Sequence, residues 1–283
     1  MTEKTQNTPG TPITVVVTGA TGRTGRRVAE AARAAGWRVR AASRARGFDW
    51  DAPESWAETL RGADAAYLVH PADVGAPAAT RAMGMLAREA VSLGVRRLVL
   101  LSARGEPEAV ATEEAVRESG AGLTVVRAAW FAQNFSEGPL AEELRLSGGL
   151  VFPGGAVPEP FVDVRDIADV VVAVLAEGDR YAGEVVEVSG PRLLTFGEAV
   201  AEVARATGRE LTYRSLPARD YGERLTGFGV PDEEAAFLTG VFGTLLDGRN
   251  ARLSDGVRRV LGREPRDFAV FAAEAAGAGA WKP

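Results

Sequence analysis

A glycine-rich turn near the N-terminus is the part of the sequence with the clearest chemical use. Gly19, Gly22 and Gly25 recur at the spacing G-x-x-G-x-x-G, directly after the valine run at residues 15–17. Such a turn lets the backbone approach a pyrophosphate, and the helix that follows points free N–H groups at it. Glycine triplets alone are weak evidence, but a buried strand before the turn and an amphipathic helix after it are the context that the motif requires. The turn therefore predicts a dinucleotide site.

The residues after the second expected strand distinguish NAD from NADP. Enzymes that use NAD usually carry an acidic residue there, roughly 20 residues after the turn, which bonds the ribose hydroxyls. This chain has Ser43 and Arg44 instead, and Arg23 inside the turn is a second cation. These side chains would bind a 2′-phosphate that an acid would repel, although both arginines could also be solvated surface residues. We therefore predict NADP(H) as the cofactor.

Composition excludes several kinds of chemistry. The chain has 283 residues, 46% of them hydrophobic, and a formal net charge of -5, so it lacks the basic surplus that binds nucleic acid. It has no cysteine, which excludes disulfides, thiolate metal sites and cysteine nucleophiles. His70 is the one histidine, so a multi-histidine metal site is impossible, and no metal is expected. Lys4 and Lys282 are the only lysines, which leaves no internal lysine for catalysis.

The sequence predicts a protein that does not enter a membrane. No apolar run approaches the roughly 20 residues of a membrane span. Residues 1–12 are polar and lack the apolar stretch of a signal peptide. We expect them to form a short disordered tail on a cytoplasmic protein, which would be a monomer or a homodimer.

Strands and helices are expected to alternate behind the turn. Strands are predicted at residues 37–43, 63–70, 95–102, 123–127 and 184–188, and helices at 78–93, 106–119 and 166–175, with Asp166 as the N-cap of the last. This alternation predicts an α/β fold of the Rossmann type, a doubly wound parallel sheet with its ligand at the carboxyl ends of the strands. Further helices are expected at 196–207, 232–246 and 265–276, with a short strand near 211–213.

The change of pattern after the fifth strand predicts two parts. Residues 13–150 are expected to form the NADP-binding Rossmann domain, with 161–190 returning to its sheet, and 191–283 a smaller, mostly helical substrate-binding lobe. The Gly- and Pro-rich segment 148–160 is expected to be a lid loop.

Several segments together resemble a known family. TGATGRTG follows the first strand, LLS ends a later strand, and LTVVRAAWFAQNF follows another, while 161–175 and 186–200 add further similarity. The chain resembles the atypical short-chain dehydrogenase/reductases over about residues 11–275, in particular the NmrA-like branch. That branch includes NADPH-dependent quinone and ketone reductases and some non-catalytic regulators.

The resemblance implies a role for each matching residue. Those expected to hold the pyrophosphate are Gly19, Ala20, Thr21, Gly22, Arg23, Thr24 and Gly25, and those for the adenosine phosphate are Ser43 and Arg44. Those expected around the nicotinamide and its ribose are Val69, His70, Pro71, Ser102, Ala128, Ala129, Trp130 and Phe131. The proline that usually follows the arginine is replaced by Ala128 after Arg127.

The chain departs from the wider superfamily at its catalytic pair. Typical members use Tyr-x-x-x-Lys, but no tyrosine or lysine lies between Ser102 and Arg127.

One explanation for the missing pair is an NADPH-dependent reductase of an aromatic polyketide-like ketone or a quinone, in antibiotic-type biosynthesis. Ser102 would then donate a hydrogen bond to the oxyanion, and substrate or water would supply the proton. The alternative is a non-catalytic NADP(H)-binding sensor of the NmrA type. A sugar-nucleotide epimerase is disfavoured because it needs the missing pair.

Other polar and aromatic residues have both a chemical and a structural interpretation. His70 and Tyr221 could donate a proton, whereas a histidine before a proline is more often a backbone-bonding loop residue. Asn134, Asp163 and Asp166 fit structural roles better than catalytic ones. Four aromatic residues could either line an apolar pocket or form ordinary core: Trp130, Phe131, Phe135 and Phe152.

Overall fold

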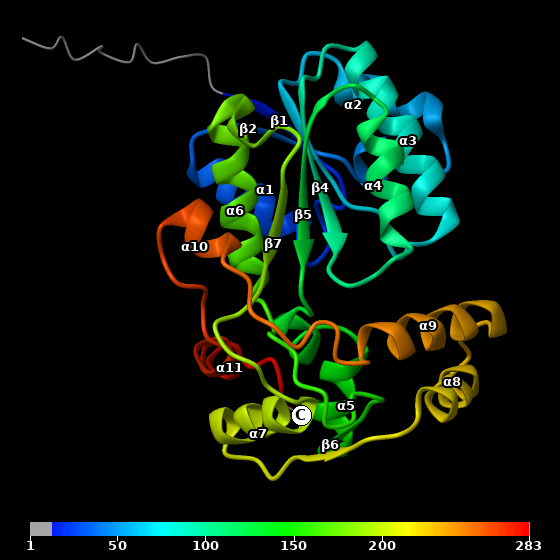
Figure 1. Ribbon diagram of the computed structural model, residues 1–283, viewed down its shortest axis with the longest axis vertical. Helices are drawn as coiled ribbons and strands as arrows, with labels where there is room; N and C mark the ends of the chain where they lie inside the picture. The colour runs from blue at the N-terminus through cyan, green and yellow to red at the C-terminus, as the bar shows by residue number, and fades with distance from the viewer. Residues whose placement is uncertain (1–12, 283) are drawn as a thin grey trace, which may run out of the picture.

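A six-stranded parallel sheet forms the centre of the molecule (Figure 1). The computed structural model describes residues 13–282, so the tail expected at 1–12 lies outside the described residues. The strands follow the order β2-β1-β3-β4-β5-β7, and all neighbours run parallel. Their bounds are β1 (Thr14–Val17), β2 (Arg38–Ala41), β3 (Ala65–Leu68), β4 (Arg97–Ala103), β5 (Gly122–Ala128) and β7 (Val185–Val188). The predicted doubly wound α/β fold is confirmed.

Helices cover both faces of this sheet, as Figure 1 shows. Val15 and Val17 point to the face covered by α1 (Gly25–Ala34), α6 (Val164–Ala176) and α10 (Gly256–Leu261). Val16 points to the face covered by α2 (Trp56–Leu60), α3 (Pro77–Ser92) and α4 (Ala109–Arg117). Because both faces are buried, the central strands β1 and β3 are apolar runs, whereas the edge strand β2 alternates as Arg-Val-Arg-Ala.

A second lobe packs below the carboxyl ends of the strands (Figure 1). It contains α5 (Pro139–Ser147), α7 (Phe196–Thr207), α8 (Ala218–Gly227), α9 (Asp232–Leu245) and α11 (Phe268–Gly277). A parallel pair of short strands completes it, β6 (Gly149–Val151) and β8 (Thr212–Arg214). Short 3-10 helices connect the elements: η1 (Arg44–Arg46), η2 (Pro53–Ser55), η3 (Ala132–Phe135) and η4 (Gly178–Tyr181). The core of the lobe is aromatic, with Phe135, Phe161, Phe196 and Phe268 in mutual edge or tilted contact.

Two predicted boundaries need correction. The segment expected as a lid loop contains β6, which pairs with β8, and its Phe152 and Glu159 are buried, so the segment is part of the packed lobe. The lobe is also not confined to 191–283, since η3, α5 and β6 belong to it, while α10 returns to the sheet. Gly256 lies so close to β7 that an added Cβ would be 2.0 Å from the Glu187 carbonyl oxygen.

The N-cap of α6 is also one turn earlier than expected. Asp163, not Asp166, caps the helix by accepting from the Arg165 amide. Asp166 is instead fully buried and accepts from the backbone amide of Arg266 at 2.7 Å and from the side chain of Arg263. Both carboxylates are structural, as expected.

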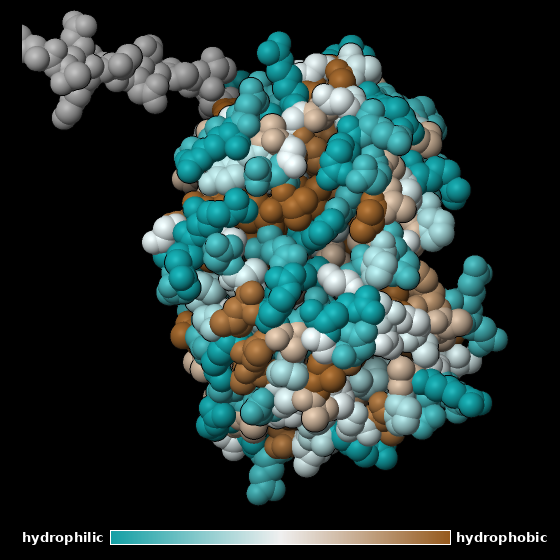
Figure 2. Space-filling model, in the orientation of Figure 1, coloured by the Kyte–Doolittle hydropathy of each residue, from teal (hydrophilic) through white to brown (hydrophobic). Residues whose placement is uncertain are grey.

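None of the helices between residues 13 and 282 has the length and apolar character that a bilayer crossing requires. On the face in Figure 2, apolar residues form small groups separated by hydrophilic ones.

Candidate functional site

The glycine turn packs so tightly that Gly19 and Gly25 have no room for a side chain and Gly22 has little. Gly19 has φ +56°, and an added Cβ there would lie 2.7 Å from Val69 Cγ1. An added Cβ at Gly25 would lie 2.2 Å from the Gly19 carbonyl oxygen, and at Gly22 3.1 Å from the same atom. The turn brings the start of α1 to the end of β1. The amides of Arg23, Thr24 and Gly25 have no hydrogen-bond partner among residues 13–282, so they are available to an anion.

Thr18 joins the turn to the neighbouring strand. Its side chain is fully buried, and its hydroxyl accepts from the Val69 amide at 2.7 Å and lies 3.0 Å from the Val69 carbonyl oxygen. The strand order reverses between β1 and β3, and the crevice at such a reversal is where open α/β sheets bind ligands. Thr18 therefore fixes the width of the crevice in which the expected cofactor residues meet. The sequence reading did not single it out.

Arg23 does not point toward Ser43 and Arg44. Its guanidinium donates to Asn134 Oδ1 at 2.5 Å and to the Glu137 carbonyl oxygen at 3.0 Å. Burial lowers the pKa of Arg23, with partial compensation from Glu137. Arg23 thus ties the glycine turn to the second lobe, which corrects its expected role as a second cation for the adenosine phosphate.

Ser43 and Arg44, the residues expected to bind the adenosine phosphate, lie at the end of β2. Ser43 is extended and half-buried, and η1 starts directly after it with Arg44 exposed. The backbone turns back on itself here, because the amides of Arg46 and Phe48 both donate to the Ser43 carbonyl oxygen. Arg44 forms no ion pair with any side chain in residues 13–282. A cation beside a hydroxyl is thus left open to solvent at the edge of the crevice.

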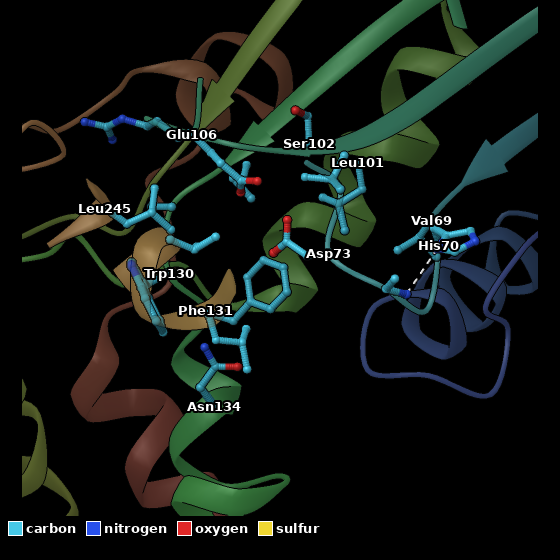
Figure 3. A pocket seen from close by; sticks show the side chains of 18 of the residues that line it. Val69, His70, Asp73, Leu101, Ser102, Glu106, Trp130, Phe131, Asn134 and Leu245 are labelled. Atoms are coloured by element: carbon cyan, nitrogen blue, oxygen red, sulfur yellow. Dashed lines mark hydrogen bonds between the residues drawn. The ribbon is translucent and has the colours of Figure 1, made fainter. Parts of the chain in front are cut away.

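A cavity of about 320 Å³ opens beside the crevice, between the carboxyl ends of β3, β4 and β5 and helix α9 (Figure 3). One wall is helix α9, which contributes Leu238, Val241, Phe242 and Leu245 at helical spacing. The opposite walls contain predicted cofactor and catalytic residues: Val69, His70, Ser102, Ala128, Ala129, Trp130 and Phe131. Of the residues expected around the nicotinamide, only Pro71 is not among those that line this apolar cavity.

Ser102 reaches this cavity, but its hydroxyl is engaged elsewhere. It donates to Glu113 Oε1 at 2.6 Å, and in Figure 3 it points away from the cavity centre. Glu113 is almost fully buried and also accepts from Arg127 Nε at 2.8 Å and Nη2 at 2.6 Å. This network holds the ends of β4 and β5 together. The geometry argues against Ser102 as an oxyanion donor, the role expected from the sequence.

His70 takes the structural alternative rather than the catalytic one. Its Nδ1 accepts from the Ala72 amide at 3.1 Å (Figure 3). Its ring meets the Trp50 ring edge-on, with the ring centroids 4.7 Å apart. Burial lowers the pKa of His70, with Asp51 acting in the opposite direction. The ring is therefore neutral at physiological pH and bound to the loop backbone.

The expected aromatic residues divide between pocket and core. Trp130 and Phe131 line the cavity, whereas Phe135 and Phe152 are buried in the core of the second lobe. The buried indole N–H of Trp130 has no acceptor within residues 13–282. Tyr221 packs against Phe152 and lies outside the cavity, and burial raises its pKa to about 12. It is not placed to donate a proton to a ligand there.

Two carboxyl groups in the cavity were not predicted from the sequence. Asp73 lies in the loop between β3 and α3, and Glu106 follows β4. Figure 3 shows both side chains directed into the cavity and toward each other. Glu106 is 4% exposed, and burial, then Asp73, raise its pKa to about 9. Their proximity depends on β3 and β4 being neighbours, and neither residue stands in a recognisable motif.

The fold and the turn define a dinucleotide-binding α/β protein of the doubly wound class. The sequence matches the family model described as the NmrA-like family over residues 45–251, and the chain belongs to that family.

Similar proteins extend over most of the chain. An uncharacterized oxidoreductase of Bacillus subtilis, YesF, is 30% identical over 87% of this chain and 90% of its own length. A (4-alkanoyl-5-oxo-2,5-dihydrofuran-3-yl)methyl phosphate reductase of Streptomyces griseus is 34% identical over 77% of this chain and 78% of its own. An NADPH-dependent quinone oxidoreductase of Escherichia coli, solved with NADPH, superposes with a TM-score of 0.73 at 20% identity, covering 92% of this chain and 99% of its own. That structural likeness bears on the fold.

Proposed function

We propose that this protein is an NADPH-dependent reductase of a carbonyl group on an aromatic or quinonoid small molecule. The observation that carries the proposal is the apolar cavity that adjoins the crevice between β1 and β3. A dinucleotide bound across the glycine turn would lie in that crevice, and Val69 and Ala129, which line the cavity, would be among the residues that hold its nicotinamide. Names of similar proteins support a reductase, including the Streptomyces enzyme that acts on a furanone phosphate.

The residues present fit NADP(H). The unpaired amides at the start of α1 suit a pyrophosphate, and the tight glycines leave the backbone free to approach it. Ser43 and Arg44 suit the 2′-phosphate. When bound, NADPH supplies the hydride and thus the redox chemistry of the reaction. The protein supplies position: Trp130, Phe131 and the α9 side chains enclose a flat acceptor and exclude water from it.

Arg44→Asp tests the cofactor assignment. Replacing the cation by an anion is expected to weaken NADPH binding about tenfold or more, because one charge-assisted contact to the phosphate becomes a repulsion. NADH, which lacks that phosphate, should bind with unchanged affinity. Titration of both nucleotides followed by fluorescence measures this.

Arg88→Asp is the matched control for this variant. Arg88 is an exposed arginine on α3, away from the glycine turn, so its replacement changes net charge equally without touching the site. Equal loss in both variants, or an unchanged NADPH affinity in Arg44→Asp, would show that Arg44 does not contact the phosphate.

A second candidate function is a non-catalytic NADP(H) sensor. It is favoured by the missing Tyr-x-x-x-Lys pair and by the engagement of Ser102 with Glu113. NADPH oxidation with a panel of quinones and polycyclic aromatic ketones separates the two functions. A reductase oxidises NADPH with at least one member, whereas a sensor binds NADPH tightly and oxidises none.

A further inference from the structure

The cavity contains a pair of carboxyl groups inside otherwise apolar walls. Glu106 is 4% exposed, and the α9 side chains that face it are Leu238, Val241, Phe242 and Leu245. Asp73 approaches it from the β3–α3 loop, as Figure 3 shows. An ionised carboxylate in such surroundings loses its hydration, and a second carboxylate beside it adds repulsion. The pair is therefore stable only if it holds a proton.

The hydrogen bonds around the pair place that proton on Glu106. Asp73 Oδ1 accepts from the Gly75 amide at 2.9 Å. Glu106 Oε1 has no hydrogen-bond partner if both groups are ionised, since two carboxylates can only accept. A proton on Glu106 turns the approach to Asp73 into a hydrogen bond, the interaction that accompanies burial in raising the pKa of Glu106 to about 9.

Backbone contacts fix the positions of both groups. An added Cβ on Gly75 would lie 2.1 Å from Glu106 Oε1, so this glycine makes the room that Glu106 occupies. Thr112 on α4 holds the loop of Asp73 by donating to the Val74 carbonyl oxygen at 2.6 Å. The pair is thus built into two loops that are anchored on α3 and α4.

No cation neutralises the pair in the described part of the chain. Arg104 also reaches the cavity, but its guanidinium donates to the carbonyl oxygens of Asn250 and Arg252. Arg249, beyond α9, pairs with Asp247.

Two further titratable groups complete the surroundings of Glu106. Glu108 is a nearby acid that raises the pKa of Glu106 further. His70 is neutral and packs on Trp50. Protonation of Glu106 is therefore the main way in which this cavity balances its charge.

We propose that Glu106, positioned by Asp73, is the proton donor that replaces the missing tyrosine, and that the substrate is a neutral carbonyl compound. This inference rests on the proposed reductase function. The carbonyl carbon receives hydride from the dihydronicotinamide, whose C4–H bond breaks with both electrons, and a new C–H bond forms. The carbonyl π electrons move to oxygen, which takes the proton of Glu106 and becomes a hydroxyl group. Glu106 is left as a carboxylate beside Asp73, and repulsion between them drives its reprotonation by water.

The protonation state is tested first on the full chain without cofactor or substrate. Infrared spectroscopy of protein labelled with ¹³C at the glutamate carboxyl detects the stretching band of a protonated buried acid at neutral pH. Glu106→Gln should remove part of this band, and Glu108→Gln, which changes an exposed acid next to it, should not. The readout is the difference from wild type because buried Glu159 contributes a band of its own. An unchanged band in Glu106→Gln would overturn the inference.

Turnover is tested second, and wild type is measured before the variants. Glu106→Gln should lower kcat by about 10²–10⁴-fold, the contribution of a positioned general acid, and leave NADPH affinity unchanged. In wild type, kcat/KM should fall as the pH rises through the pKa of Glu106, about 9, and this fall should be absent in Glu106→Gln but present in Glu108→Gln.

The other outcomes of the turnover experiment separate failure of the inference about Glu106 from failure of the proposed reductase function. If Glu106→Gln keeps the wild-type rate and pH profile, the proton comes from elsewhere and the inference is wrong, while the reductase function stands. If wild type binds NADPH but reduces no carbonyl acceptor, the proposed function fails and the inference with it.

Gly75→Ala provides a separate test of position. The added methyl group competes for the space of Glu106 Oε1 without changing any charge. Gly75→Ala should lower kcat, as Glu106→Gln does. Its kcat/KM should still fall as the pH rises toward alkaline values, because the acid is displaced rather than removed. Full activity in Gly75→Ala would contradict the described placement of Glu106.

Discussion

Glu113 was not predicted as a functional residue from the sequence, yet its position determines the role of Ser102, which was. The carboxylate lies beneath the candidate site and accepts from both Ser102 and Arg127. Because Ser102 is the donor to a buried charge, its hydroxyl stabilises the ends of β4 and β5. Resemblance to the family placed Ser102 correctly at the end of its strand, but only the position of Glu113 on α4 shows where the hydroxyl points.

Ser102→Ala is expected to affect stability rather than catalysis. Loss of one hydrogen bond to a charged, buried acceptor should lower the free energy of unfolding by about 1.5–3 kcal/mol. Turnover at a permissive temperature should stay close to that of wild type. Urea denaturation and steady-state kinetics on the same preparation measure both effects. Removal of an oxyanion donor costs about 10²–10³-fold in kcat, so a loss of that size at unchanged stability would restore the role expected from the sequence.

At the scale of elements, the strand-turn-helix unit is the part that the sequence predicted best. Its strand, three glycines and helix are local in sequence, and the valine run and helical spacing are found as β1 and α1. The elements α2, β6, α5, α8 and α10 were not predicted. Helix α5 begins at Pro139, inside a stretch expected to belong to the Rossmann domain, and β6 is fixed by pairing with β8, far along the chain.

Gly25→Ala tests whether the packing of the glycine turn excludes a side chain at this position. The new Cβ would lie 2.2 Å from the Gly19 carbonyl oxygen and 2.8 Å from that of Thr18, so the turn must open. Overpacking of this kind costs about 1–3 kcal/mol, and NADPH affinity should fall about tenfold or more as the amides move. Nucleotide titration and thermal unfolding measure the two effects.

Gly240→Ala is the control for this substitution. Gly240 is exposed on α9, and an added Cβ there has no neighbour within 4 Å. The alanine should leave NADPH affinity unchanged and raise stability by about 0.5–1 kcal/mol through helix propensity. Wild-type affinity in Gly25→Ala would mean that the turn tolerates a side chain and that the described packing is wrong.

In the whole molecule, an ion-pair cluster joins the start of α1, beside the sheet, to the second lobe. Arg23, Arg26 and Arg27 on the α1 side all approach Glu137 on the lobe side. Residues so far apart in sequence cannot be paired from the sequence alone, because their meeting depends on how the chain returns after β5. For the same reason the carboxyl pair Asp73–Glu106 became visible only once β3 and β4 were placed side by side.

The buried acids predict an unusual dependence of stability on pH. Burial raises the pKa of Glu106 to about 9 and of Glu159 to about 8, above the ordinary value of 4.5. Both groups bind their proton more tightly in the folded chain, so their stabilising contribution is complete below about pH 4.5 and is lost as the pH rises through 8 and 9. Thermal unfolding at intervals between these limits should show a falling Tm.

Glu159→Gln isolates one of these groups. Both Glu159 oxygens are buried without a hydrogen-bond partner among the described residues, so a neutral amide should reduce the fall in Tm toward alkaline pH. Glu114→Gln, an exposed acid on α4, should reproduce the wild-type curve. A wild-type pH dependence in Glu159→Gln would mean that the carboxyl is ionised in the folded protein.

Transfer of a deuterium label tests directly whether the protein reduces a carbonyl with NADPH in the cavity between the strand ends and α9. NADPH labelled with deuterium at C4, prepared separately in each stereochemical form, is incubated with the protein and the most active quinone or aromatic ketone, and the product is analysed by mass spectrometry. With a ketone, label is expected on the former carbonyl carbon. With a quinone, whose product hydroxyl groups exchange with water, label is expected to be lost from C4 of the oxidised cofactor. Either result should come from one stereochemical form of the cofactor only. Tight binding of NADPH without transfer or loss of label with any acceptor would contradict reduction by this protein.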